Sequence, residues 1–163
     1  MKPGILALAC ALALVAAPQR GGTEVIAPRA APSVDESVAW YRARAAAGDA
    51  AAQYEVAHLE FIGLLPQSAA GETVRLLTAA AEAGNDQAAL LLARLREFGF
   101  EGAAPDPVQA FAWYERVAVR APTADLRATA AEASRRLRPR MTAAQLAQAA
   151  TGAAFSSAQA HSP

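Results

Sequence analysis

The sequence has very few of the residues that usually build catalytic and metal sites. It contains one cysteine, Cys10, and two histidines, His58 and His161. A single cysteine allows no disulfide within the chain and no zinc site built on several thiolates. No G-x-S-x-G elbow, H-E-x-x-H helix or phosphate-cradling glycine loop occurs either. We therefore expect no enzyme, no metal site and no cofactor.

An excess of charge of either sign is also missing. The 15 Lys and Arg residues balance 15 Asp and Glu residues, so the formal net charge is zero. Such a chain exerts no long-range attraction on nucleic acid or an anionic membrane, and we expect no nucleic-acid partner. The one basic cluster consists of Arg135, Arg136, Arg138 and Arg140. We expect these arginines to meet the negative end of a helix dipole and solvent, with polyanion binding as the alternative.

The first residues have the pattern of an export signal. Met1-Lys2 is a short basic start, residues 5–15 form an apolar run, and Val15-Ala16-Ala17 fits a small-residue cleavage site. The run is shorter than the roughly 20 residues that span a bilayer, and no later segment is long and apolar enough. We predict a signal peptide over residues 1–17 and a periplasmic or secreted protein.

Cys10 offers an alternative to simple cleavage. The stretch Leu6-Ala7-Leu8-Ala9-Cys10 loosely resembles a bacterial lipoprotein box. Very few apolar residues separate Lys2 from this cysteine, so we expect Cys10 to leave with the signal. A lipid-anchored protein held through Cys10 is the competing hypothesis.

An internal repeat with a spacing of 36 residues dominates the rest of the chain. Residues 48–54, GDAAAQY, return as residues 84–90, GNDQAAL. At the same spacing Trp40 corresponds to Leu76. At a spacing of 37 residues, Leu76-Leu77 corresponds to Trp113-Tyr114. Repeats of this length are typical of stacked supersecondary units that bury their apolar faces against one another. Such folds usually present a binding surface rather than a catalytic cleft.

Helix start and stop signals divide the repeats into helices. Gly48-Asp49 and Gly84-Asn85 each combine a glycine that ends one helix with a side chain that caps the next. Capping boxes are predicted at Ser33 with Glu36, at Asp106 with Gln109 and at Thr142 with Gln145. Four expected helices cover residues 34–47, 50–62, 72–83 and 86–98. A fifth begins at residue 107, a sixth begins at Thr123 and ends before Pro139, and a seventh covers residues 143–150.

The resulting domain organisation is simple. We expect a flexible linker over residues 18–32, which are rich in proline and glycine, a repeat domain over 33–150, and a disordered tail over 151–163. The fold class is all-α, an α/α-solenoid of about three helical hairpins plus a short C-terminal helix. Alanines such as Ala88 and Ala93 fall on the predicted seam, so the helices should approach closely.

These motifs resemble the Sel-one-like repeat (SLR), an α/α relative of the tetratricopeptide repeat, over about residues 34–137. The matching residues are Gly48-Asp49, Ala52, Gln53-Tyr54, Val56 and Gly63, then Gly84-Asn85, Ala88, Leu92 and Gly99, and then Asp106, Ala110, Trp113-Tyr114 and Ala118. The chain departs from the pattern where Ala57 and Ala93 replace a glycine and where Glu60 and Arg96 replace a tyrosine. The resemblance implies a scaffold or adaptor that binds partners on the surface lined by the first helix of each repeat.

That geometry nominates six partner-binding residues: Tyr54, His58, Phe61, Leu90, Arg94 and Glu97. His58 and Arg94 hold equivalent positions in successive repeats, where they would form a polar ladder for a peptide's carbonyl or carboxylate groups. In the alternative interpretation Tyr54, Phe61 and Leu90 belong to the core while His58 and Arg94 are solvated.

Two further groups favour a structural interpretation. Trp40, Tyr41, Trp113 and Tyr114 lie at helical spacing opposite leucines, so we expect core residues rather than a stacking platform. Glu60, Glu82 and Glu97 are expected to be solvated helix charges rather than a catalytic pair.

Taken together, these features predict an exported repeat scaffold that binds a protein or peptide in the bacterial cell envelope. The alternatives are a lipid-anchored or polyanion-binding envelope protein, and a hydrolase acting on peptidoglycan or a β-lactam. The resemblance implies the hydrolase alternative, because some cysteine-rich relatives have been linked to β-lactam binding. The chain lacks those cysteines and any serine-lysine motif.

Overall fold

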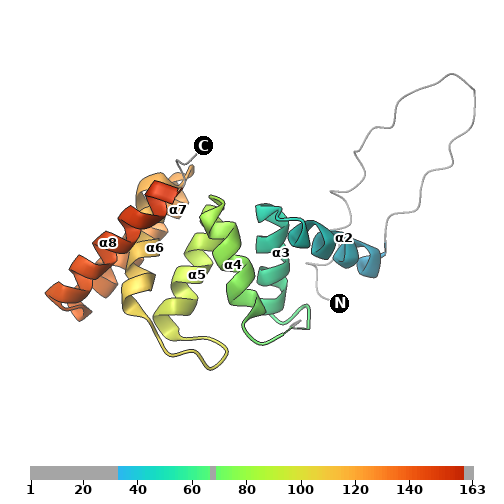
Figure 1. Ribbon diagram of the computed structural model, residues 1–163, viewed down its shortest axis with the longest axis horizontal. Helices are drawn as coiled ribbons and strands as arrows, with labels where there is room; N and C mark the ends of the chain where they lie inside the picture. The colour runs from blue at the N-terminus through green and yellow to red at the C-terminus, as the bar shows by residue number, and fades with distance from the viewer. Residues whose placement is uncertain (1–32, 67–68, 160–163) are drawn as a thin grey trace, which may run out of the picture.

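The computed structural model describes residues 33–66 and 69–159. Within these ranges it consists of α-helices joined by short turns and two longer loops (Figure 1). The predicted signal peptide, Cys10, the linker over 18–32 and His161 lie outside the described residues.

The described helices follow the predicted order. They are α2 (Val34–Ala46), α3 (Ala50–Phe61), α4 (Glu72–Glu82), α5 (Asp86–Phe98), α6 (Pro107–Arg120), α7 (Ala124–Leu137), the 3₁₀ turn η1 (Arg138–Arg140) and α8 (Ala143–Gln159). No strand occurs in residues 33–66 and 69–159; the only extended pairing there is an isolated bridge between Phe100 and Ala103. The all-α solenoid is confirmed.

The two glycine junctions adopt the same local geometry. Gly48 and Gly84 have φ values of +90° and +95°, a region that glycine enters without a Cβ penalty. The following residues, Asp49 and Asn85, cap α3 and α5 through their side-chain oxygens. The hydrogen bond from Arg44, together with the amide of Ala52, lowers the pKa of Asp49. Both junctions therefore fold neighbouring helices into equivalent antiparallel pairs.

Two of the three predicted capping boxes form completely. Ser33 and Glu36 exchange hydrogen bonds at the start of α2, and Thr142 and Gln145 do so before α8. At α6 only half of the box is present. The Asp106 side chain accepts a hydrogen bond from the Gln109 amide, but the Asp106 amide donates to the carbonyl of Arg96, 2.6 Å away. Because this donor already has a partner, the Gln109 side chain is not required there.

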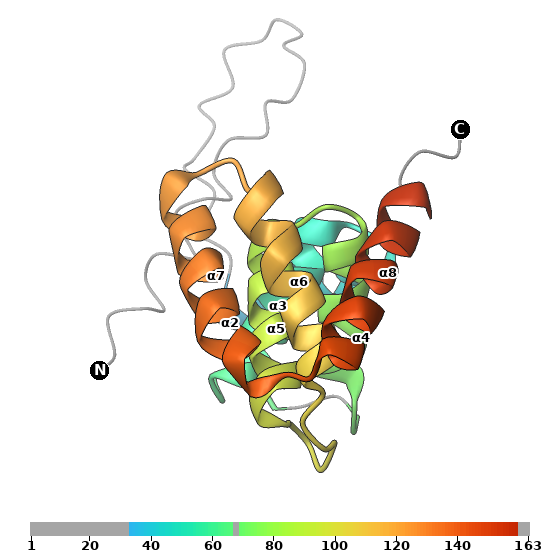
Figure 2. The ribbon, with the colours of Figure 1, turned by 90° about the vertical axis from the view of Figure 1, so that its left-hand side faces the viewer.

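The core is a seam made largely of alanine. From α2 to α7 the helices stack in chain order, each against the next, whereas α8 packs on α6 (Figures 1 and 2). Ala88 and Ala93 are completely buried, as predicted, and the bulk is supplied by Leu77, Leu92 and Tyr114. Small side chains let the helix axes approach closely, so the seam gains stability from contact area.

The last helix is longer than predicted. We expected it to end near Ala150, yet α8 continues to Gln159. The residues beyond Ala150 are mostly alanine, serine and glutamine, and a single interior glycine, Gly152, disfavours a helix by only about 1 kcal/mol. That penalty does not end a helix that is rich in alanine. Of the predicted tail, residues 160–163 lie outside the described part of the chain.

No helix within the described residues is long and apolar enough to cross a membrane.

Candidate interaction surface

The candidate surface is built from the first helices of two successive repeats, α3 and α5. At a spacing of 36 residues, the positions considered for this surface form five equivalent pairs. These pairs are Ala51 with Gln87, Tyr54 with Leu90, His58 with Arg94, Phe61 with Glu97, and Ile62 with Phe98. The repeat therefore presents related chemistry twice along the array.

Tyr54 and Leu90 hold equivalent, half-buried positions on these helices. Both pack against the hydrophobic core. Tyr54 also stacks on His58, with ring centroids 5.4 Å apart and planes 7° from parallel. Burial and, secondarily, the nearby Glu55 raise the pKa of Tyr54, so its ring stays neutral at physiological pH. The half-buried tyrosine thus holds His58 in a defined orientation.

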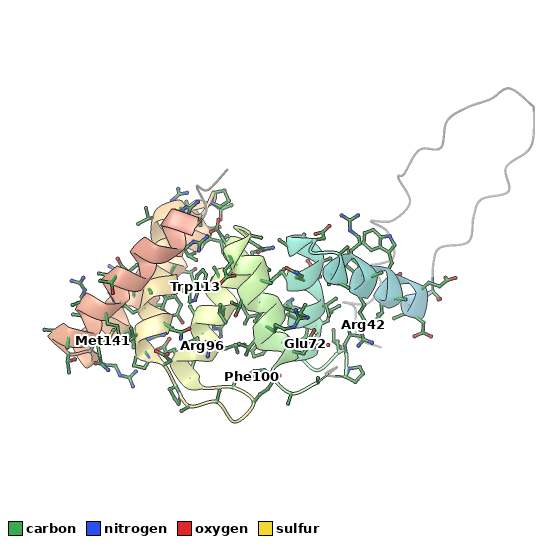
Figure 3. All side chains as sticks on the ribbon, in the orientation of Figure 1. Arg42, Glu72, Arg96, Phe100, Trp113 and Met141 are labelled. Carbon is green, nitrogen blue, oxygen red and sulfur yellow. The ribbon has the colours of Figure 1, made fainter. Side chains whose placement is uncertain are left out.

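Phe61 lies at the end of α3 and is 37% exposed. Its ring centroid is 5.7 Å from that of Phe100, which belongs to the loop between α5 and α6 (Figure 3). Gly99 precedes this loop with φ +79°, and a Cβ at this position would lie 2.7 Å from the Ala103 carbonyl oxygen. The tight turn at Gly99 therefore places Phe100 beside the preceding repeat.

Glu97 does not face a groove as a free carboxylate. Its side chain is buried, accepts a hydrogen bond from the Tyr114 hydroxyl at 2.9 Å and pairs with Arg136 at 3.0 Å. The three residues come from α5, α6 and α7, so this network joins successive helices. The expectation that Glu97 is a solvated helix charge is wrong, because the stack of α6 and α7 covers it. Among the six nominated residues, Glu97 is the one that is buried.

Glu60 is a second buried carboxylate that was expected to be solvated. It accepts a hydrogen bond from the Thr73 hydroxyl at 3.1 Å, between α3 and α4. Of the three glutamates considered, only Glu82 is exposed. Periodicity alone cannot distinguish a buried glutamate with partners from a solvated one.

Ile62 and Phe98 are surface residues that the sequence interpretation missed. Both are apolar, lie 36 residues apart at the ends of α3 and α5, and are 48% and 65% exposed. Each follows its polar neighbour, His58 or Arg94, by four residues, which places the two on the same side of the helix. The repeat shows that both positions carry a large apolar residue, but only the structure shows that both are exposed.

The aromatic residues divide between core and surface. Tyr114 is fully buried, and Tyr41 and Trp113 are partly buried against the core, as expected. Trp40 is 40% exposed, so its assignment to the core is wrong. It lies on α2, which packs mainly on α3, and no other helix of residues 33–66 and 69–159 covers the indole. The Arg44 guanidinium instead lies 4.7 Å from the ring centroid.

The basic cluster is only partly neutralised within the molecule. Arg136 pairs with Glu97, and the Arg138 guanidinium lies 5.7 Å from the centre of the Phe111 ring. Arg135 and Arg140 are exposed. Across residues 33–66 and 69–159, no carboxylate lies within 4 Å of Arg135, Arg138 or Arg140.

The described residues contain no group of three or more histidine, cysteine or carboxylate side chains that could hold a metal ion. The only histidine in these ranges, His58, stacks on Tyr54. The arrangement therefore offers a surface for contact: half-buried Tyr54 and Leu90, exposed apolar side chains at the helix ends, and one polar side chain in each repeat, His58 or Arg94.

Comparison with solved structures agrees with this architecture. The chain is similar to a protective antigen present in uropathogenic Escherichia coli strains that displays an SLR fold, with a TM-score of 0.64 and 27% sequence identity. The match covers 74% of this chain and 25% of the antigen, so the chain spans about a quarter of that protein's length. No protein-family model matches the sequence, and no curated protein is significantly similar to it. The chain is an SLR-like helical repeat protein.

Proposed function

We propose that this protein is a scaffold that binds a peptide or an extended segment of a partner protein along α3 and α5. The observation that carries the proposal is a repeated pair of side chains, partly exposed His58 with exposed Ile62, and exposed Arg94 with exposed Phe98. Each pair combines a hydrogen-bonding group with an apolar side chain one helical turn away. Repetition at 36 residues presents the two pairs on successive units of one rigid stack.

The apolar members would supply most of the binding free energy. Fully burying a phenylalanine or isoleucine side chain stabilises a complex by about 1.5–3 kcal/mol. Phe98 is 65% exposed in the free protein, so much of that area is still available to a partner. Binding energy in such interfaces concentrates in a few large side chains of this kind.

The polar members would supply orientation. The Arg94 guanidinium is exposed and presents a planar set of donors that matches a carboxylate or two carbonyl oxygens. His58 is held against Tyr54 and can offer a ring nitrogen to a peptide group. Because the helices are already ordered by the alanine seam, little conformational entropy of the scaffold is lost on binding.

The cell envelope is the proposed location. Support comes from the basic start, apolar run and small-residue cleavage pattern within residues 1–17. Mass spectrometry of the mature N-terminus provides the test. A chain that begins near Pro18 fits cleavage, a diacylated Cys10 fits the lipid-anchored alternative, and an intact Met1 contradicts both.

The binding surface is tested with peptides selected from a displayed random library on the immobilised wild-type protein. Fluorescence anisotropy with the enriched peptides then compares wild type with Ile62→Ser/Phe98→Ser and with Arg94→Ala. We expect each variant to weaken binding by tenfold or more, equivalent to about 1.4 kcal/mol. Val119→Ser serves as the matched control, because Val119 is 78% exposed and belongs to α6 rather than to α3 or α5.

The same variants apply to photo-crosslinking in envelope extracts. A specific partner should be captured by wild type and Val119→Ser and lost in Ile62→Ser/Phe98→Ser. Peptides that bind all four proteins equally would contradict the proposed surface.

A further inference from the structure

The basic cluster of Arg135, Arg136, Arg138 and Arg140 is separate from the proposed peptide surface on α3 and α5. The first two arginines lie in the last turn of α7, and the other two belong to η1. Figure 2 views this end of the row, with α7 and α8 nearest the reader and the turn that joins them at the lower edge. Figure 3 shows Met141, the residue after η1, near the extremity of the described stack. The cluster therefore lies on an outer corner.

Only one charge of the cluster is neutralised by an ion pair within the described residues. Arg136 pairs with Glu97 at 3.0 Å. Arg135, Arg138 and Arg140 are exposed, and no carboxylate of residues 33–66 and 69–159 lies within 4 Å of them. The carboxyl end of α7 is equivalent to about half a negative charge, which is too little to neutralise three arginines.

The carboxylates near the cluster lie behind its outermost arginines. Glu132 precedes Arg135 by three residues on α7, and Glu115 of α6 accepts a hydrogen bond from the Ser134 hydroxyl. No acidic residue follows Glu132 in the chain, so η1 and the start of α8 carry positive charge alone. A surface that meets this corner from outside therefore meets arginine side chains first.

The cluster lacks the apolar side chains that anchor a protein partner. The exposed large hydrophobic residues of the described chain are Val34, Trp40, Phe61, Ile62, Leu64, Phe98 and Val119. None of them belongs to α7, η1 or the part of α8 whose side chains are described. Protein interfaces obtain most of their binding free energy from buried aromatic and aliphatic residues. The corner instead suits a partner that is attracted by charge density alone.

The shape and composition of the corner favour a flat partner over a threaded strand. Proteins that bind single-stranded nucleic acid combine a basic groove with aromatic rings that stack on the bases. Residues 121–154 contain no aromatic residue, and the arginines lie on an outer corner. A bilayer presents many phosphates in one plane, and guanidinium groups pair closely with phosphate oxygens.

From these observations we propose that the corner docks on the surface of an anionic phospholipid bilayer through Arg135, Arg138 and Arg140. The formal net charge of zero gives no attraction from a distance. At contact, however, only charges within a Debye length act, about 10 Å at 0.1 M salt. Docking at the end of the row leaves α3 and α5 uncovered, so the inference does not depend on the proposed peptide surface.

Co-sedimentation of the purified full-length protein with phospholipid vesicles provides the test. One set of vesicles is phosphatidylcholine alone, and the other contains phosphatidylglycerol as well. Each arginine near an anionic surface strengthens binding by about fivefold, so Arg135→Gln/Arg138→Gln/Arg140→Gln should lower the partition coefficient by about 100-fold on anionic vesicles at about 0.01 M salt. The difference should disappear at about 1 M salt and on phosphatidylcholine. Wild type and variant share residues 1–32, so their ratio reports on the cluster.

Two further variants make the test specific. Arg135→Lys/Arg138→Lys/Arg140→Lys should bind anionic vesicles nearly as well as wild type, because attraction by a bilayer depends on charge rather than on the guanidinium fork. The matched control is Arg42→Gln/Arg94→Gln/Arg120→Gln, which removes three exposed charges from α2, α5 and α6. This control should bind vesicles like wild type even if it no longer binds selected peptides, which separates the inference from the proposed function.

Four results would overturn the proposal. They are a wild type that leaves anionic vesicles unbound, a glutamine variant of the cluster that partitions like wild type, a lysine variant that loses binding, and a control that loses as much binding as the cluster variant. Wild-type protein that binds poly-L-glutamate through the same arginines and ignores the vesicles would give the first of these results. It would assign the cluster to an acidic protein instead.

Discussion

At the scale of single residues, the polar groups of the interior connect successive helices. Glu97 joins Tyr114 and Arg136, and Glu60 joins Thr73. A buried carboxylate is tolerated only when hydrogen bonds and charges satisfy it. These contacts therefore specify which helix lies against which, in a seam where alanines offer little difference in shape.

Tyr114 should make the stability of the protein sensitive to alkaline pH. Burial, and then the hydrogen bond to Glu97, raise the pKa of Tyr114 above its usual value of 10. The folded state thus favours the protonated phenol, so its stabilising contribution is complete below pH 10 and is lost as the pH rises further. The free energy of unfolding, from urea titrations followed by circular dichroism, should fall as the pH rises above 10.

The control for this effect is Tyr114→Phe, which removes the hydroxyl but keeps the ring. At neutral pH it should lower the free energy of unfolding by about 0.5–1.5 kcal/mol, the usual contribution of one hydrogen bond. Above pH 10 the free energy of unfolding of Tyr114→Phe should decline less steeply than that of wild type. Tyr54→Phe keeps the Tyr114 contribution, so its free energy of unfolding should decline more steeply than that of Tyr114→Phe. Equal slopes in wild type and Tyr114→Phe would contradict the assignment.

At the scale of secondary-structure elements, caps set the helix boundaries and alanines set the distance between helices. Asn85 accepts a hydrogen bond from the Ala88 amide at 2.9 Å and donates to the Ala50 carbonyl at 3.4 Å. One cap therefore both starts α5 and ties it to the start of α3. The alanine seam then allows the helix backbones to lie close together.

Ala93→Leu and Ala88→Leu should overpack this seam. Both alanines are completely buried, and added methyl groups in a filled interior typically destabilise by about 1–3 kcal/mol. Thermal unfolding should show a lower melting temperature for each variant. Ala128→Leu, on the exposed side of α7, is the matched control and should unfold near the wild-type temperature. Unchanged unfolding of both seam variants would refute the packing described.

At the scale of the whole molecule, the protein is a one-dimensional stack. Each helix contacts mainly its neighbours in the chain, so stability is close to a sum of local helix stabilities and nearest-neighbour interfaces. Helices inside the row have a neighbour on each side, whereas α2 packs mainly on α3 and α8 mainly on α6. The two ends are therefore the weakest parts of the described stack.

Hydrogen exchange followed by mass spectrometry should reveal this gradient. Amides of α2 and α8 should exchange first, because terminal helices open without disrupting a second interface. Amides of α4, α5 and α6 should exchange last and near the rate of global unfolding. Equal protection of α2 and α5 would show that the array unfolds as a single unit.

The sequence by itself determined the helices, their order and the repeated geometry. Caps such as Asp49, Asn85 and Thr142 act within a few residues, and glycines such as Gly48 permit a backbone that other residues rarely adopt, so their effect can be predicted from neighbours in the chain. The same locality explains why the alanine seam at Ala88 and Ala93 was predicted correctly. The other five nominated residues lie exposed or partly exposed on α3 and α5: Tyr54, His58, Phe61, Leu90 and Arg94. Their role in binding stays a prediction.

Only the tertiary structure decided which polar groups are buried and which apolar ones are not. Glu97 is internal because α6 and α7 cover it, while Trp40 is exposed because no helix lies beyond α2 in the described stack. Ile62 and Phe98 likewise became visible as a pair only once their helix ends were seen to be uncovered. Burial depends on what packs against a residue from elsewhere in the chain, and short-range patterns carry no information about that neighbour.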